Sequence, residues 1–322
     1  MGTPEFASGC LKALVNDGLN VVAVVTMPDK PIGRGQKTGM SDVKRCALEL
    51  GLPILQPQKL KDPVFLKELA DFRADLQIVV AFRMLPQEVW SMPRLGTFNL
   101  HASLLPLYRG AAPIQRAIWN GESQSGVTTF LLDKDLDTGA ILYQEKTTIT
   151  AEETAGSLHD KLLRLGAPLV VKTARDLFAG NITPKPQTVS NEAALPTAPK
   201  IFKQDCFVDF SMPAEKVFRQ IKALSPYPGA IGCLQQFSTQ KILPVKLLDA
   251  SLEQENEKSY EQGRIISDNK HFVKIVCGDN RTISITKIQL AGKKQLTIEE
   301  FLKGFRLDVS KDLFLLGVIN NQ

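Results

Sequence analysis

The sequence predicts an α/β domain built on a parallel sheet, followed by a smaller β-barrel. In the first half, short β-branched apolar runs alternate with helical stretches of ten or so residues. A proline-rich stretch at 184–199 has little apolar periodicity and is typical of a linker. Beyond it, several strand-like runs are separated by polar turns, which favours a barrel. We therefore expect a first domain at residues 1–187, a linker at 188–203 and the barrel at 204–322.

The composition fits a soluble globular protein and excludes several other classes. The chain has 322 residues, 43% hydrophobic and 23% charged, and its net charge of +5 permits an anionic partner without requiring one. No apolar run approaches the roughly 20 residues of a membrane span, so we expect no membrane partner. The five cysteines form no C-x-x-C pair and the chain has three histidines, which predicts reduced thiols, no metal site and a cytoplasmic location.

The elements follow from apolar periodicity, caps and prolines. Ser41 is a helix N-cap, Asp62 and Pro63 open another helix, and Pro113 lies in the first turn of a third. Pro168 could interrupt the longest helix. We expect strands at 20–26, 54–55, 76–81, 97–100, 127–132, 142–149, 242–247, 263–267, 272–277 and 282–288, and helices at 4–15, 41–51, 62–72, 113–120, 153–178 and 214–224.

Polar residues at the ends of two strands predict one site. Asn99 and His101 are two residues apart, so an extended chain points both side chains to the same side. The strand at 127–132 runs into Asp133, Asp135 and Asp137. Side chains of these types at strand ends suit a site at the C-terminal edge of a parallel sheet.

These residue types support acyl transfer to an amine. His101 can exchange a proton near neutral pH, and Asn99 can donate an N–H to an oxyanion. Asp137 can orient His101 or steer a water molecule that carries the proton away. The residues alone equally allow a capping asparagine, a hydrogen-bonded buried histidine and a turn aspartate.

Two long motifs resemble those of the 10-formyltetrahydrofolate-dependent formyltransferases. One is NLHASLLP from Asn99 to Pro106, followed by YRG, and the other is Gly126 to Leu142, which contains LDTG. The resemblance implies a doubly wound, Rossmann-like sheet, an OB-like barrel, and Asn99, His101 and Asp137 as the catalytic residues. It also implies 10-formyltetrahydrofolate as formyl donor, no metal, and a folate-contacting loop of Ser103, Leu104, Leu105 and Pro106.

A second folate segment follows the strand at 76–81. The segment resembles the part of the family that lines the pterin pocket, and apolar side chains with backbone polar groups suit a flat heterocycle. The alternative is a plain strand-to-helix loop whose Phe82 and Leu85 face the core. Its residues are Phe82, Arg83, Met84 and Leu85.

A basic loop resembles the one that family members acting on initiator methionyl-tRNA use against the acceptor end. A solvated loop is the alternative, and scattered surface lysines are commoner than RNA-binding ones. Lysines of the barrel could also face RNA phosphates. The predicted tRNA-binding residues are Lys30, Arg34, Lys37, Lys293 and Lys294.

The start of the chain differs from the family pattern. The turn from Met1 to Phe6 resembles a family turn that follows an apolar first strand in the centre of the sheet, and that strand is absent here. Because its loss would leave neighbouring backbone groups unpaired, we expect the true start to lie upstream.

The sequence therefore predicts transfer of a formyl group from 10-formyltetrahydrofolate to the amino group of methionine on initiator methionyl-tRNA. Rival acceptors are a small amine, a sugar-nucleotide amine or water, and a non-catalytic RNA-binding protein is the rival class. No obligate protein partner is implied, so we expect a monomer.

Overall fold

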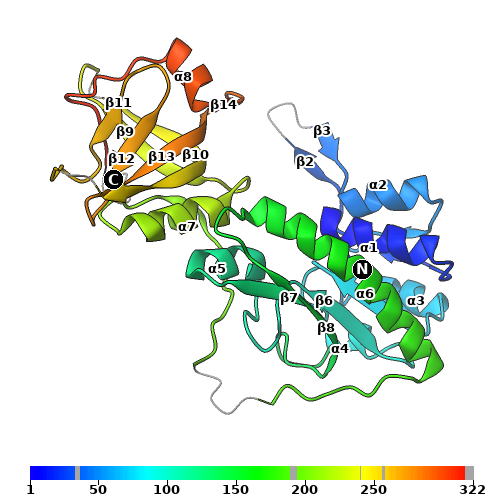
Figure 1. Ribbon diagram of the computed structural model, residues 1–322. Coiled ribbons are helices and arrows are strands. Elements are labelled where there is room, and N and C mark those ends of the chain that lie inside the picture. Colours follow the sequence, from blue (N-terminus) through cyan, green and yellow to red (C-terminus); the bar gives the residue numbers. More distant parts are fainter. Residues whose placement is uncertain (33–36, 189–193, 240, 256–257, 316–322) are drawn as a thin grey trace. The chain divides into compact units, whose positions relative to one another are not determined.

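The computed structural model describes residues 1–32, 37–188, 194–239, 241–255 and 258–315. They form two compact units, each described by itself below (Figure 1). The first comprises residues 1–113, 124–148 and 159–198, and the second comprises 114–123, 149–158 and 199–322.

The first unit is built on parallel strand pairs extended by antiparallel strands. β5 (Gln77–Val80) is parallel to β6 (Thr97–His101), and β1 (Val24–Val25) is parallel to β4 (Ile54–Leu55). β7 (Gln124–Leu131) and β8 (Ile141–Thr148) continue the order β5-β6-β7-β8, and β7 runs antiparallel to both of its neighbours. Mixed sheets are common in α/β folds, and the predicted α/β fold class is confirmed.

Met1 and Gly2 lie between β1 and β5. Gly2 N donates to Val25 O at 3.0 Å, and Val80 N donates to Met1 O at 2.9 Å. A cavity of about 530 Å³ adjoins these two residues, and its lining includes Leu14, Val22 and Ile78.

Caps and prolines set the helix bounds of this unit as expected. The Ser41 hydroxyl accepts from Lys44 N, and the Asp62 carboxylate accepts from Val64 N with Pro63 in the first turn. The helices are α1 (Glu5–Asn16), α2 (Asp42–Glu49), α3 (Pro63–Asp71), the unpredicted α4 (Gln87–Trp90), α5 (Pro113–Asn120) and α6 (Ala155–Ala179), of which α5 lies mainly in the second unit.

α6 covers one face of the sheet (Figure 1). Gly166 lets it approach closely, since a Cβ there would lie 2.8 Å from Leu100 Cδ2. The helix is continuous through Pro168, so the interruption that we considered at this residue is not present.

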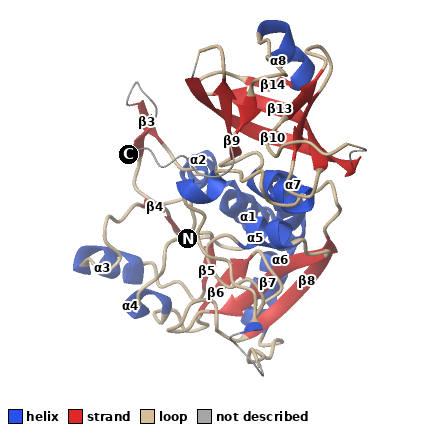
Figure 2. Ribbon diagram, turned by 90° about the vertical axis from the view of Figure 1, so that its left-hand side faces the viewer, coloured by secondary structure: helices blue, strands red, loops and turns tan. Residues whose placement is uncertain are grey.

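The second unit is a nearly closed antiparallel barrel (Figure 2). Its strand order is β11-β12-β13-β10-β9-β15, with β14 on β13, and Phe314 N donates to Gly263 O next to β11. The strands are β9 (Ala230–Gln236), β10 (Lys241–Glu255), β11 (Ile265–Ser267), β12 (Val273–Val276), β13 (Arg281–Leu290), β14 (Gln295–Thr297) and β15 (Leu313–Phe314).

Two helices pack on the barrel. α7 (Ala214–Leu224) was expected, and α8 (Ile298–Gly304) was missed. A capping box between Thr297 and Glu300 opens α8. The sequence contains this signal, a threonine followed three residues later by a glutamate.

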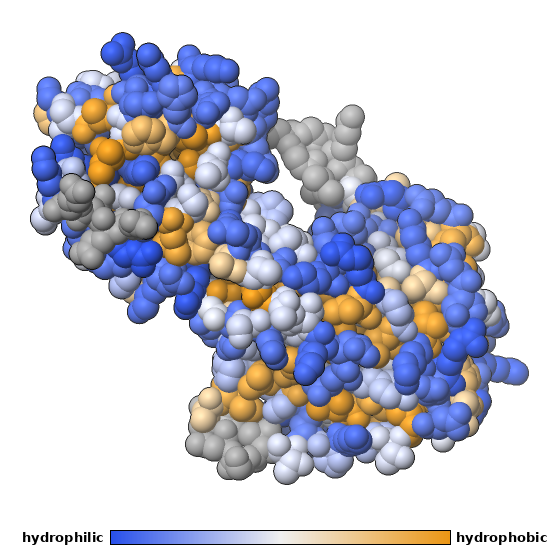
Figure 3. Space-filling model, viewed as in Figure 1, coloured by the Kyte–Doolittle hydropathy of each residue, from blue (hydrophilic) through white to orange (hydrophobic). Residues whose placement is uncertain are grey.

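The side chains separate into a buried core and a mixed surface. All five cysteines are buried as free thiols, and burial raises the pKa of Cys10 and of Cys277 to about 12. The face seen in Figure 3 carries hydrophilic residues with small groups of hydrophobic ones between them. In the part of the chain that the structure describes, no helix combines the length and apolarity needed to cross a bilayer.

Phe210→Ala tests the barrel core. The ring is fully buried and packs against Phe314 with centroids 5.4 Å apart. Removing it should lower the free energy of unfolding of the barrel by about 3–5 kcal/mol, because the cavity cannot fully collapse. The control is Phe237→Ala at a ring that is 52% exposed. Equal losses in urea unfolding of the two variants would contradict the assigned core.

Candidate active site

His101 lies at the end of β6 in a buried position. Its side chain is 6% exposed, and its ring meets Phe130 of β7 edge-on. Nε2 lies 2.8 Å from Tyr108 O. Because a carbonyl oxygen only accepts, Nε2 carries the hydrogen and Nδ1 is left as the position where the ring gains or loses a proton.

Asp137 faces that second nitrogen. Its Oδ2 lies 3.8 Å from His101 Nδ1 and accepts a hydrogen bond from Gly110 N at 2.9 Å. The side chain is 11% exposed, so the imidazole and the carboxylate are both largely screened from water. A proton that the ring gains at Nδ1 therefore lies opposite a carboxylate.

We expected the strands before His101 and Asp137 to end at the same edge of a parallel sheet, and the structure differs. β7 is antiparallel to β6, so Leu131 pairs with Phe98 at the start of β6 rather than lying beside its end. Periodicity identifies a strand but not its direction. The loop after β7 closes the distance by turning back, with Leu131 N donating to Ala140 O at 2.9 Å.

Local chemistry shapes this loop. Asp133 Oδ1 accepts from Asp135 N and from the Thr138 hydroxyl. Asp137 has a left-handed φ of 55°, and a Cβ on Gly139 would lie 1.7 Å from Leu131 O. Only glycine fits at 139, and this close approach directs Asp137 toward β6.

Asn99 occupies the middle of β6. It pairs with Val79 on one side and Phe130 on the other, and it is half-buried. It lies two positions before His101, so both side chains leave the strand from the same face. The structure thus brings Asn99, His101 and Asp137 to one region of the first unit.

Side chains of β7 and β8 fix the predicted folate loop at 103–106. The Thr128 hydroxyl donates to Ser103 O at 2.7 Å and accepts from Leu105 N at 3.1 Å. Gln144 Nε2 donates to Leu105 O at 2.8 Å, and the Ser103 hydroxyl donates to Leu107 O at 2.6 Å. Sequence reasoning missed Thr128 and Gln144, because a polar residue on a strand gives no signal of its distant partner.

The segment from Phe82 to Leu85 follows β5 and therefore leaves the sheet at the same edge as His101. Leu85 is buried in a core cluster, whereas Met84 is 68% exposed. Arg83 lies over the Phe82 ring and donates to the carbonyls of Pro57 and Gln58. Burial lowers the pKa of the Arg83 guanidinium. The core-facing alternative holds for Leu85, and Phe82 packs partly buried against the same cluster.

The predicted basic residues are divided between the units. Lys30 is exposed at the start of β2 (Lys30–Ile32), and Lys37 opens β3 (Lys37–Gly39). Arg34 lies outside the described residues. In the second unit, Lys293 and Lys294 are exposed in the turn between β13 and β14.

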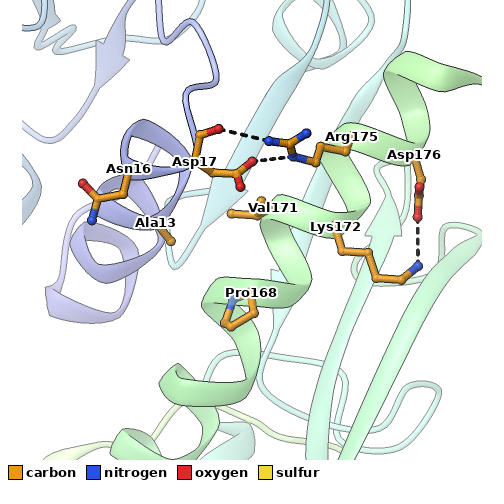
Figure 4. Close-up of a pocket in the computed structure, with 8 residues that line it drawn as sticks. All are labelled: Ala13, Asn16, Asp17, Pro168, Val171, Lys172, Arg175 and Asp176. Carbon is orange, nitrogen blue, oxygen red and sulfur yellow. Dashed lines mark hydrogen bonds and ion pairs between the residues drawn. The ribbon is translucent and has the colours of Figure 1, made fainter.

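A separate open groove lies between α1 and α6, with a volume of about 550 Å³ (Figure 4). Its basic side chains are already paired: Arg175 bonds Asp17, and Lys172 bonds Asp176 at 2.8 Å. The Arg175–Asp17 pair links α6 to the residue that follows α1, whereas the Lys172–Asp176 pair lies within α6. None of the predicted site residues lines the groove. Across the described ranges, no group of three or more His, Cys, Asp or Glu is placed to hold a metal ion.

Family models match both halves of the chain. A model described as formyl transferase matches residues 1–173, and one described as formyl transferase, C-terminal domain, matches residues 200–306.

Curated proteins named methionyl-tRNA formyltransferase are similar along nearly the whole chain. The one from Bacteroides thetaiotaomicron is 47% identical over 313 residues, 95% of each chain. That from Porphyromonas gingivalis is 47% identical over 318 residues, 98% of this chain and 97% of its own.

Solved structures share the fold. An N-formyltransferase from Helicobacter canadensis, in complex with folinic acid and dTDP-3-aminofucose, aligns with a TM-score of 0.62 at 19% identity, covering 88% of this chain and 96% of its own. HypX from Aquifex aeolicus in complex with tetrahydrofolic acid aligns with a TM-score of 0.58 at 23% identity, covering 81% and 45%.

Gly139→Ala tests the loop that carries Asp137. A Cβ at this position meets a backbone oxygen, so the loop must move. We expect faster amide hydrogen exchange across residues 133–139, with the barrel unchanged. Gly304→Ala, whose Cβ would meet nothing within 4 Å, is the matched control. Unchanged exchange in Gly139→Ala would show that the loop is not held by this contact.

Proposed function

The chain belongs to the methionyl-tRNA formyltransferases, and on that premise we propose that Asn99, His101 and Asp137 carry out its reaction. The enzyme transfers the formyl group of 10-formyltetrahydrofolate to the free amino group of methionine on initiator methionyl-tRNA. The product is N-formylmethionyl-tRNA, which is used in translation initiation. The observation that supports the three residues best is the buried imidazole with Nδ1 facing the Asp137 carboxylate, next to a half-buried amide on the same strand.

The reaction needs a stabilised oxyanion and a path for one proton. The methionine nitrogen attacks the formyl carbon, a C–N bond forms, and the carbonyl π electrons move to oxygen. When the carbonyl re-forms, the bond from carbon to N10 breaks and its electron pair goes to N10. The amine loses a proton and N10 gains one, so atoms and charge balance without any other reactant.

Asn99 is the direct oxyanion donor in this proposal. His101 Nε2 already donates to Tyr108 O, which leaves the Asn99 amide as the N–H that can point at the oxyanion. Removing one such donor typically lowers kcat by about 100- to 1000-fold.

His101 and Asp137 handle the proton. Nδ1 can hold the proton that leaves the amine, because the imidazolium so formed lies opposite a carboxylate. The positive ring also stabilises the oxyanion electrostatically. Gly110 N fixes the carboxylate, so Asp137 needs no rearrangement as the proton arrives.

The two loops at the end of β5 and β6 are proposed to bind the folate. Ser103, Leu104, Leu105 and Pro106 form a loop whose backbone is held by β7 and β8, and the segment from Phe82 to Leu85 leaves the sheet at the same edge. A fixed backbone with apolar side chains suits recognition of a flat heterocycle.

The tRNA is proposed to contact basic residues of both units, namely Lys30, Arg34, Lys37, Lys293 and Lys294. Four of these lie in the described ranges, and Lys30, Lys293 and Lys294 are exposed, which phosphate contact requires. We further propose the domain bounds 1–187, 188–203 and 204–322, a monomeric state and a cytoplasmic location, where the tRNA substrate is charged.

Asp137→Ala tests the site. Without the carboxylate, the imidazolium loses its partner, and kcat should fall by about 100-fold or more. The assay follows formyl-methionine on initiator tRNA by mass spectrometry. Asp135→Ala, at an exposed aspartate of the same loop, should retain activity. Normal turnover in Asp137→Ala would exclude Asp137 from the mechanism. If the parent protein formylated only a sugar-nucleotide amine, that amine and not methionyl-tRNA would be the acceptor.

The double variant Lys293→Ala, Lys294→Ala tests the barrel contacts. KM for the tRNA should rise, and its dependence on salt should weaken by about 0.7–0.9 in log–log slope per lost phosphate contact. The control is Lys67→Ala, an exposed lysine of α3. An unchanged slope in the double variant would exclude these two residues from the RNA interface.

A further inference from the structure

Gln187 lies two residues beyond Lys185, and its place in the sequence indicated no role. Backbone hydrogen bonds join described residues on either side of Gln187 to the first unit. Lys185 exchanges two backbone hydrogen bonds of 2.8 Å with Ile141, and Ala198 N donates to Arg109 O at 2.8 Å. Gln187 is half-buried, whereas both of its chain neighbours are exposed.

All four hydrogen-bonding positions of the Gln187 amide are used. Nε2 donates to Asp137 O at 2.9 Å and to Gly139 O at 2.8 Å. Oε1 accepts from Arg109 Nη2 at 2.8 Å and from Nε at 3.2 Å. The two carbonyls can only accept and the guanidinium can only donate, so this network fixes the amide in one orientation.

The contacts of Gln187 fall on three residues that help to place the Asp137 carboxylate. Asp137 has the left-handed φ of 55°, which is costly for a residue with a side chain and needs external support. Gln187 binds the carbonyl of Asp137 itself and that of Gly139. Arg109 directly precedes Gly110, whose N–H holds the carboxylate. The Gln187 side chain thus binds the backbone carbonyl of Asp137 and also Arg109, the neighbour of the residue that holds the Asp137 carboxylate.

We propose that Gln187 is a positioning residue that sets the Asp137 carboxylate against His101 Nδ1. This inference rests on the proposed role of Asp137. Gln187 acts through Asp137 and does not touch the reacting atoms. Its loss lets the 137–139 backbone turn, which moves the carboxylate away from the ring while the folate loop at 103–106 keeps its own hydrogen bonds to Thr128.

A double-mutant cycle separates positioning from a general structural role. Single-turnover rates of formyl transfer are measured with excess enzyme for the parent, Gln187→Ala, Asp137→Ala and the double variant. Gln187→Ala should lower the rate roughly 10- to 100-fold, as expected when a reacting group is displaced by about 1 Å. In the Asp137→Ala background it should change the rate less than about twofold, because no carboxylate remains to be misplaced.

Two further variants serve as controls. Gln187→Glu keeps the oxygen that faces Arg109 but loses both donors, so it should lose rate as Gln187→Ala does. Lys185→Ala changes an exposed side chain and keeps the backbone bonds to Ile141, so it should retain the parent rate. In both Gln187 variants kcat should fall while KM for the tRNA stays within about twofold, since the RNA contacts are untouched.

An equal loss in both backgrounds, a normal rate in Gln187→Ala, or a change confined to KM would overturn the inference. A fully active Asp137→Ala would overturn the proposed role of Asp137 first, and the inference with it. That outcome is recognised from the single variant alone, so the two failures are distinguishable.

Discussion

The site depends on the placement of one largely buried carboxylate against one buried imidazole. His101 Nε2 is committed to the Tyr108 carbonyl, so only Nδ1 can exchange a proton, and Asp137 lies 3.8 Å from it. In a region screened from water, a charge that forms on the ring is stabilised mainly by the groups that face it. A displaced carboxylate would leave the reacting proton without a defined position.

The rest of the first unit keeps these two groups in place. α6 packs closely on β6 at Gly166, against Leu100, which lies between Asn99 and His101. The loop after β7 returns toward β6 because only glycine fits at 139 and because Gly110 N holds the carboxylate. Such supporting contacts cost no reorganisation during the reaction, which is the advantage of a preorganised site.

The sequence predicted the elements well where local chemistry determines them. Ser41 and Asp62 mark helix starts through their own side chains, and α7 spans the residues that its apolar spacing predicts. Asn99, His101 and Asp137 come together in the first unit, as the paired motifs suggested. The direction of β7 could not be predicted, because alternation of apolar residues is the same in either direction. Gln187 was missed because its partners are 48, 50 and 78 positions away in the chain.

The most direct test of this account is the tautomer of His101. The chain has only three histidines, so a long-range ¹H–¹⁵N spectrum of the ¹⁵N-histidine-labelled protein is simple, and Asp137→Ala assigns the His101 signals. We predict that the neutral ring carries its hydrogen on Nε2 and that protonation occurs at Nδ1. A neutral ring with its hydrogen on Nδ1 would contradict the proposed proton path, because Nδ1 could not then accept the proton that leaves the amine.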